Sequence, residues 1–98
     1  MFTDSLGTTY LVFAHYDANG SGYTYSSNGS SWTTDTTDTK FVTTWDERLW
    51  GISSVGQLWY STAIGTEVND AVLPAPDGFV TALFVARNAA GIPILYAA

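Results

Sequence analysis

The sequence predicts an all-β protein made of short antiparallel strands. Runs of Val, Ile, Thr, Tyr, Phe and Trp, which favour strands, alternate with clusters of Gly, Asn, Asp, Ser and Pro, which favour turns. No segment combines a helical period, capping residues and the length that a helix requires. Apolar residues make up 46% of the chain and charged residues only 12%, so Ser, Thr, Asn and Gly must supply most of the polar surface.

Strands are expected wherever an aromatic or β-branched run lies between two turn signals. Residues 1–9 are polar and predict only a short first strand that includes Phe2, Thr3 and Leu6. Further strands are predicted at residues 10–16, 23–25, 41–45, 49–52, 57–61, 79–86 and 93–97, with a strand or loop at 33–39 and a less regular segment at 67–73. Residues 74–78 must interrupt the strands, because two prolines remove backbone donors there and fix φ.

One polar hairpin, Tyr25–Trp32, organises the prediction. A strand end runs into a turn with Asn28 and Gly29 at its tip, and Trp32 follows. This pattern is typical of a hairpin that closes over its own hydrophobic anchor, so we expect the Trp32 indole to be buried. A less regular copy of the hairpin occupies residues 60–68.

The hairpin belongs to a longer internal repeat. Three pairs of segments match after about 35–38 residues, namely 11–14 with 49–52, 25–27 with 60–62, and 41–43 with 79–81. Each repeat contains four strand-like segments, which is the size of one blade of a β-propeller. We therefore expect a single domain with units at residues 1–40 and 41–78 and an incomplete unit at 79–98.

These segments resemble the sialidase-type Asp-box, or BNR-repeat, β-propellers, whose hairpins carry Ser-x-Asp-x-Gly-x-x-Trp. The first hairpin follows that motif with Asn in place of Asp and one residue fewer before the tryptophan, at Ser26, Asn28, Gly29 and Trp32. The second hairpin keeps the spacing without the acid or the indole, at Ser61, Gly65 and Val68. Residues 80–85 and 94–97 are also similar to the strands that open a blade in this family. Because the motif is structural in that family, the resemblance implies a fold and hairpin anchors rather than an activity.

No catalytic residue and no cofactor are expected. In the family that the chain resembles, sialidase chemistry requires a cluster of arginines and a tyrosine activated by an acid, whereas this chain has only Arg48 and Arg87. The sequence shows no Ser-His-Asp order, no paired carboxylates in apolar surroundings and no phosphate-binding loop. His15 is the only histidine and lies in an apolar run, which favours a place in the core or at a sheet edge over a metal or catalytic role.

No metal site is expected either, although residues 17–22 allow two interpretations. Oxygen-bearing side chains alternate there, as in tight calcium loops, but position twelve of such a loop is Asn28 rather than an acid. An ordinary hairpin turn fits the segment better. The aspartates that lie among Thr, Pro and Gly are expected to be turn and cap residues, at positions Asp4, Asp35, Asp38, Asp70 and Asp77.

Charge and length predict self-association rather than nucleic-acid or membrane binding. The net charge is −6 with only three cations, so a phosphate backbone or an anionic membrane would be repelled. Neither a transmembrane run nor a secretory signal is recognisable, and the lack of cysteine leaves the redox compartment open. Propellers close with about four to eight blades and this sequence holds roughly two and a half, so we expect a homo-oligomeric ring. The alternative is a small monomeric β-sandwich.

A sugar-binding site is one interpretation of the charged turn at residues 46–48. An acid, a bidentate donor and indole faces are what sugar sites use, and the segment has them at Trp45, Asp46, Glu47, Arg48 and Trp50. The other interpretation is a charged turn with an internal salt bridge between two core tryptophans. Repetition around a ring would let weak sites act by avidity. The predicted function is a non-enzymatic, self-assembling propeller module that binds glycans, and the alternative is a purely structural or designed oligomeric repeat fragment without a ligand.

Overall fold

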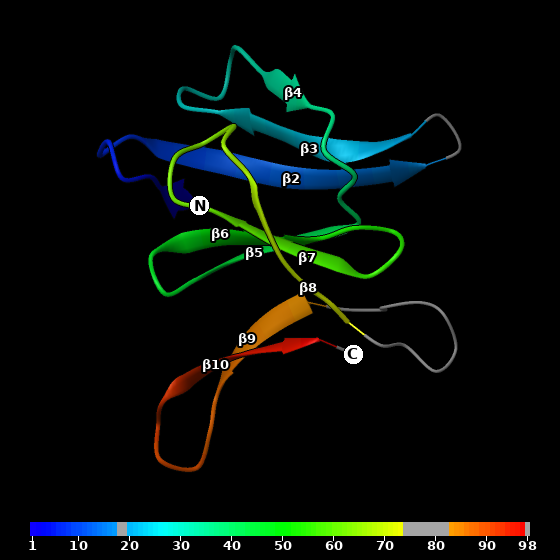
Figure 1. Ribbon diagram of the computed structural model, residues 1–98. Helices are drawn as coiled ribbons and strands as arrows, with labels where there is room; N and C mark the ends of the chain where they lie inside the picture. The colour runs from blue at the N-terminus through cyan, green and yellow to red at the C-terminus, as the bar shows by residue number, and fades with distance from the viewer. Residues whose placement is uncertain (18–19, 74–82, 98) are drawn as a thin grey trace.

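Throughout the described residues, the regular structure of this chain is β. The computed structural model describes residues 1–17, 20–73 and 83–97, which form ten strands in antiparallel sheets (Figure 1). Two of the sheets have four strands each. The prediction of an all-β chain with four-stranded antiparallel sheets is therefore confirmed for these ranges.

The first two sheets are four-stranded meanders in which each strand pairs with the next one along the chain. The first sheet contains β1 (Phe2–Thr3), β2 (Thr9–Asp17), β3 (Gly20–Ser26) and β4 (Thr33–Asp35). The second sheet contains β5 (Phe41–Trp45), β6 (Arg48–Ile52), β7 (Gln57–Ser61) and β8 (Val68–Val72). The third sheet is the hairpin of β9 (Leu83–Arg87) and β10 (Pro93–Ala97).

The repeated sequence segments occupy equivalent strands. Segments 11–14 and 49–52 lie in β2 and β6, the second strands of the two four-stranded sheets. Segments 25–27 and 60–62 lie at the ends of β3 and β7, the third strands. The third match, which involves residues 79–81, and the predicted break at 74–78 lie outside the described residues. Each four-stranded sheet therefore corresponds to one repeat of the sequence.

The sheets lie in layers, with the second sheet between the other two (Figure 1). One core, between the first and second sheets, contains Phe2, Tyr23, Leu49 and Trp59. A second core contains Trp50, Ile52 and Leu83 and joins the second sheet to the third. Because successive side chains of a strand point to opposite faces, β6 contributes Leu49 to one core and Trp50 to the other.

The indole of Trp59 crosses β6 at Gly51. These two residues are directly opposed in the β6–β7 register. A Cβ atom at position 51 would lie 2.2 Å from two ring carbons of Trp59, so only glycine leaves room for the indole. The same indole stacks on Tyr23 of the first sheet, with ring centroids 5.3 Å apart. Gly51 thereby permits the central contact between the first two sheets.

The prediction that Trp32 is a buried hairpin anchor is wrong. Trp32 is 44% exposed and packs against Phe13, which is itself 58% exposed, with ring centroids 5.8 Å apart. The neighbour of Phe13 on β2, Val12, packs on the core between the first and second sheets, so Phe13 points to the opposite face. His15 lies two residues further along β2 and is also exposed. The indole therefore lies on the outer face of the first sheet.

Candidate functional site

The side chains of the first polar hairpin bind its own backbone. The Ser26 hydroxyl accepts hydrogen bonds from the backbone N–H groups of Asn28 (3.2 Å) and Gly29 (2.8 Å). Asn28 Oδ1 accepts hydrogen bonds from the N–H groups of Ser30 (2.8 Å) and Ser31 (2.9 Å). Gly29 has a φ of +77°, which glycine adopts without steric cost. These groups hold the β3–β4 turn in place.

The second hairpin has a simpler network. Ser61 is fully buried, and its hydroxyl donates to the carbonyl oxygen of Ala63, which occupies the position equivalent to Asn28. The N–H group of Thr66 donates to the same carbonyl over 3.1 Å, and Gly65 has a φ of +82°. The alanine side chain cannot accept hydrogen bonds from the backbone of the turn tip as Asn28 does.

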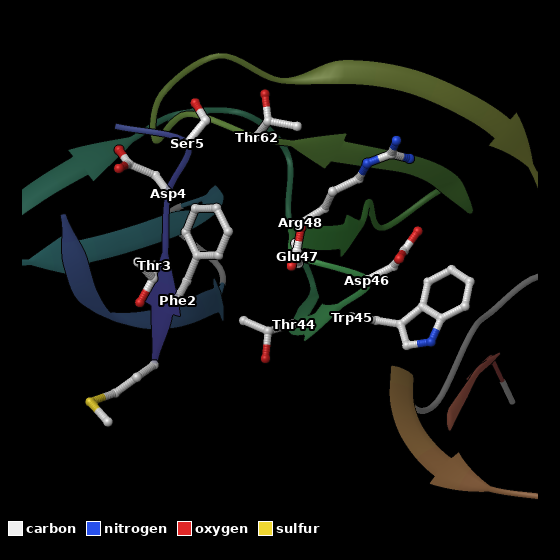
Figure 2. Close-up of a pocket in the computed structure, with 11 residues that line it drawn as sticks. Phe2, Thr3, Asp4, Ser5, Thr44, Trp45, Asp46, Glu47, Arg48 and Thr62 are labelled. Atoms are coloured by element: carbon white, nitrogen blue, oxygen red, sulfur yellow. The ribbon is translucent and has the colours of Figure 1, made fainter. Parts of the chain in front are cut away.

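Four of the five residues predicted to bind a glycan line one open pocket of about 820 Å³. One wall is the N-terminal segment 1–5, and the other is formed by residues 44–48 of the β5–β6 hairpin (Figure 2). Thr62, which follows β7, completes the lining. The first and second sheets therefore form this pocket jointly.

The β5–β6 turn places two carboxylates at the pocket in a strained conformation. Trp45 and Arg48 pair across the hairpin, which leaves Asp46 and Glu47 as a two-residue loop with φ angles of 53° and 59°. Such turns favour Asn-Gly, because both residues adopt positive φ. Holding two other side chains in this region costs about 1–3 kcal/mol each. Both residues are exposed, so their carboxylates remain accessible at the pocket.

The two predicted sugar-binding tryptophans have different surroundings. Trp45 lines the pocket, although its Nε1 donates to the carbonyl oxygen of Pro93 over 3.1 Å. Trp50 is 5% exposed, and its Nε1 donates to the carbonyl oxygen of Trp45 over 3.0 Å. Trp50 therefore belongs to the core between the second and third sheets, and its predicted place in a sugar site is wrong.

The charge of the pocket is negative. Its lining includes three carboxylates and one guanidinium. The Arg48 guanidinium lies 4.8 Å from the centroid of the Tyr60 ring, which is a cation–π contact. On the opposite wall, Asp4 Oδ1 accepts hydrogen bonds from the N–H groups of Leu6 and Thr8, each over 3.1 Å, as its predicted turn role requires. This excess of carboxylates would repel an anionic ligand.

A second polar cluster joins the first and second sheets. The Tyr23 hydroxyl on β3 donates to Glu67 Oε1, just before β8, and lies 3.1 Å from Asp35 Oδ2 at the end of β4. A phenol has one proton and donates to one carboxylate at a time. If one carboxyl group keeps a proton, it can donate to the phenol oxygen while the phenol donates to the other carboxylate. Sequence reasoning missed this cluster because no local motif connects residues that only sheet packing brings together.

The pKa values in this cluster are shifted in opposite directions. Burial, together with the neighbouring Asp35, raises the pKa of Glu67. Burial also disfavours the Asp35 carboxylate, but hydrogen bonds involving Glu67, Thr37 and Tyr23 outweigh burial and lower the pKa of Asp35. The pKa of Tyr23 is raised by burial and by the two carboxyl groups. These directions mean that Glu67 binds a proton more readily than Asp35 does.

Asp38 forms another polar link between the first two sheets. Its carboxylate accepts hydrogen bonds from the hydroxyls of Ser21, on β3, and Ser54, in the β6–β7 turn, the latter over 2.7 Å. Burial opposes ionisation of Asp38, but these hydrogen bonds outweigh it and lower its pKa. Asp38 thus links sheets as well as lying in a loop, whereas Asp70 is exposed on β8 and Asp77 lies outside the described residues.

Within the described ranges, no three His, Asp or Glu side chains come together as ligands for a metal ion. In the segment that allowed a calcium-loop interpretation, β2 and β3 extend to Asp17 and Gly20, which pair across the hairpin. Residues 18–19 lie outside the described residues.

No protein-family model matches the chain, and no curated protein or solved structure shows significant similarity to it. Across the part of the chain that the structure describes, no helix has the length and hydrophobicity needed to span a bilayer.

Proposed function

We propose that this chain is a non-enzymatic β-propeller segment that assembles with copies of itself into a ring and binds a glycan in the β5–β6 pocket of each copy. The observation that carries this proposal is the apolar surface on the outer faces of the first and third sheets. Leu11 and Phe13 on one face, and Phe84 and Tyr96 on the other, are between 38% and 58% exposed.

The layered sheets support assembly. The second sheet packs against a core on each of its two faces, whereas the first and third sheets each contribute to only one of these cores. Contiguous exposed apolar surface usually marks an interaction site. Further copies of the chain would cover the outer faces in the way that the second sheet is already covered.

The chemistry of the pocket supports a sugar ligand. Asp46 and Glu47 offer acceptors for sugar hydroxyls, Arg48 offers donors, and Trp45 offers an apolar surface for C–H groups. The excess of carboxylates favours neutral glycans over acidic ones. An open single site of this kind binds weakly, so presentation of one site per copy around a ring would raise the apparent affinity.

The double substitution Asp46→Asn/Glu47→Gly tests the glycan site. It removes both carboxylates and creates the Asn-Gly pair that this turn geometry prefers, so thermal stability should rise while glycan-array binding is lost. Asp70→Asn, which neutralises an exposed carboxylate on β8, is the matched control and should keep full binding. Unchanged glycan binding by the double variant would contradict the assignment of the pocket.

A purely structural oligomer without a ligand is the second candidate. It is favoured by the environment of Trp45, whose Nε1 bonds the Pro93 carbonyl and whose ring lies 5.7 Å from that of Trp50. These contacts hold the indole against the third sheet and reduce the area of the ring that a sugar could contact. An assembled wild type that binds no glycan on the array would support this candidate over the first.

A further inference from the structure

The two faces of each sheet have distinct and consistent roles. On the second sheet, Leu49 packs toward the first sheet, and Trp50 packs toward the third. The equivalent residues of the first sheet are Leu11 and Val12, and Val12 packs toward the second sheet. We call the side that faces the preceding sheet the P face and the side that faces the following sheet the N face. Leu49 therefore lies on a P face and Trp50 on an N face, and the alternation of β2 puts the equivalent residues Leu11 and Val12 on the same two kinds of face.

The open face of the first sheet is its P face. Leu11 and Phe13 lie on it, and the β2–β3 and β3–β4 registers place Thr24 and Thr34 beside Phe13. Trp32 packs on the Phe13 ring. The Asp35 carboxylate contacts the buried Tyr23, on the covered side. This P face carries hydroxyls, the His15 imidazole and apolar groups.

The open face of the third sheet is its N face. Leu83 and Leu95 belong to the core shared with the second sheet, so the alternate residues point outward. Phe84 and Tyr96 pair across β9 and β10, and their rings stack with centroids 5.4 Å apart and an interplanar angle of 19°. This stack presents an aromatic surface without charge, on the side of the molecule opposite the first sheet (Figure 1).

We propose that the N face of β9–β10 in one copy packs on the P face of β1–β4 in the next copy, in a head-to-tail contact. This inference rests on the proposed self-assembly and adds which surfaces meet. Leu49 shows that the P face of the second sheet is covered by the sheet before it, and Leu11 occupies the equivalent position on the open face of the first sheet. The other open surface is an N face, so a head-to-tail contact covers both, whereas a two-fold contact between two P faces or two N faces would leave the other kind open. Head-to-tail contacts build rings when the rotation closes.

Complementary mixing of two variants tests this contact. Phe13→Glu places a charge on the P face alone, and Phe84→Glu places one on the N face alone; both side chains are exposed, so folding should persist. Sedimentation velocity should show each variant as a monomer, whereas the wild type assembles. An equimolar mixture should form a species of twice the monomer mass and no larger one, because each variant supplies the face that the other lacks.

Matched controls separate loss of the contact from loss of the fold. Val55→Glu adds the same charge at a side chain that is 75% exposed in the β6–β7 turn, and it should assemble like the wild type. Phe13→Thr and Phe84→Thr keep strand propensity and should weaken assembly in the same pattern, with unchanged far-UV circular dichroism.

Two results would overturn the head-to-tail contact while leaving self-assembly intact. One is a single variant that retains the mass of the wild-type assembly, since a face that can be lost without effect is not in the contact. The other is a mixture that stays monomeric at concentrations where the wild type assembles. A wild type that is itself monomeric would instead contradict the proposed function from which this inference starts.

Discussion

Single side chains determine how closely the first two sheets approach. Trp59 fills the space above Gly51 and stacks on Tyr23, and all three residues are buried. The Trp59 Nε1 atom is buried with no hydrogen-bond partner among the described residues. Since an unsatisfied buried N–H group costs free energy, the indole must be retained here for its apolar area and shape.

Gly51→Ala should destabilise the fold strongly, although the substitution adds only one methyl group. The added methyl group would lie 2.2 Å from the Trp59 ring carbons, so the indole must shift away from Tyr23. Overpacking of this kind costs about 1–3 kcal/mol in the free energy of unfolding, measurable by urea denaturation. Trp59→Phe in the same chain removes the clashing ring, so the double variant should lose less than the sum of the single losses. Additive losses would show that the two residues do not clash.

Protonation of Glu67 should make stability depend on pH. Its raised pKa means that the folded state binds the proton more tightly than the unfolded state, so this contribution falls as pH rises above about 4.3, the ordinary value for glutamate. Glu67→Gln is neutral at every pH and keeps an amide that can hydrogen-bond Asp35. The difference in Tm between the variant and the wild type should therefore change in favour of the variant as pH rises toward neutrality.

The matched control for this pH experiment is Asp70→Asn, which removes an exposed carboxylate from β8 outside the cluster. Its Tm curve should run parallel to that of the wild type. A parallel curve for Glu67→Gln as well would show that folding does not raise the pKa of Glu67.

At the scale of elements, the β3–β4 hairpin depends on one asparagine. Asn28→Ala removes the acceptor for two backbone N–H groups, which leaves them to water because the turn is exposed. The expected loss is about 1 kcal/mol in the free energy of unfolding, from chemical denaturation. Asn28→Asp keeps an oxygen that can accept both hydrogen bonds and should retain wild-type stability. Equal stability of the alanine variant would mean that the turn does not need this side chain.

The positions of the strands can be predicted from the sequence more accurately than which face of each strand is buried. Turn residues and β-branched runs bound β5, β6, β7 and β10 in the sequence almost as the structure has them, because these signals are local. The exposure of Trp32 was not predictable, and the sequence left Trp50 open between the core and a sugar site, since both depend on which sheet covers which face. The pocket hairpin at 45–48 was recognisable from its charges, but its opposite wall, residues 1–5, comes from another sheet.

At the scale of the whole molecule, the layered arrangement leaves two unlike aromatic surfaces at its two ends. The interface between the first and second sheets shows how such a surface is covered, because Tyr23 of one sheet stacks on Trp59 of the next. The same packing continued between copies would bury Phe13 and Trp32 of one chain against Phe84 and Tyr96 of another. Ring formation would then follow from the chain's own repeat.

The native mass of the purified chain, measured by sedimentation velocity over a range of concentrations, tests this account most directly. The account predicts a closed assembly whose mass is an integer multiple of 10.6 kDa and which dissociates in the Phe13→Glu variant. A single species of 10.6 kDa at every concentration, with Phe13 and Trp32 still in water, would contradict it.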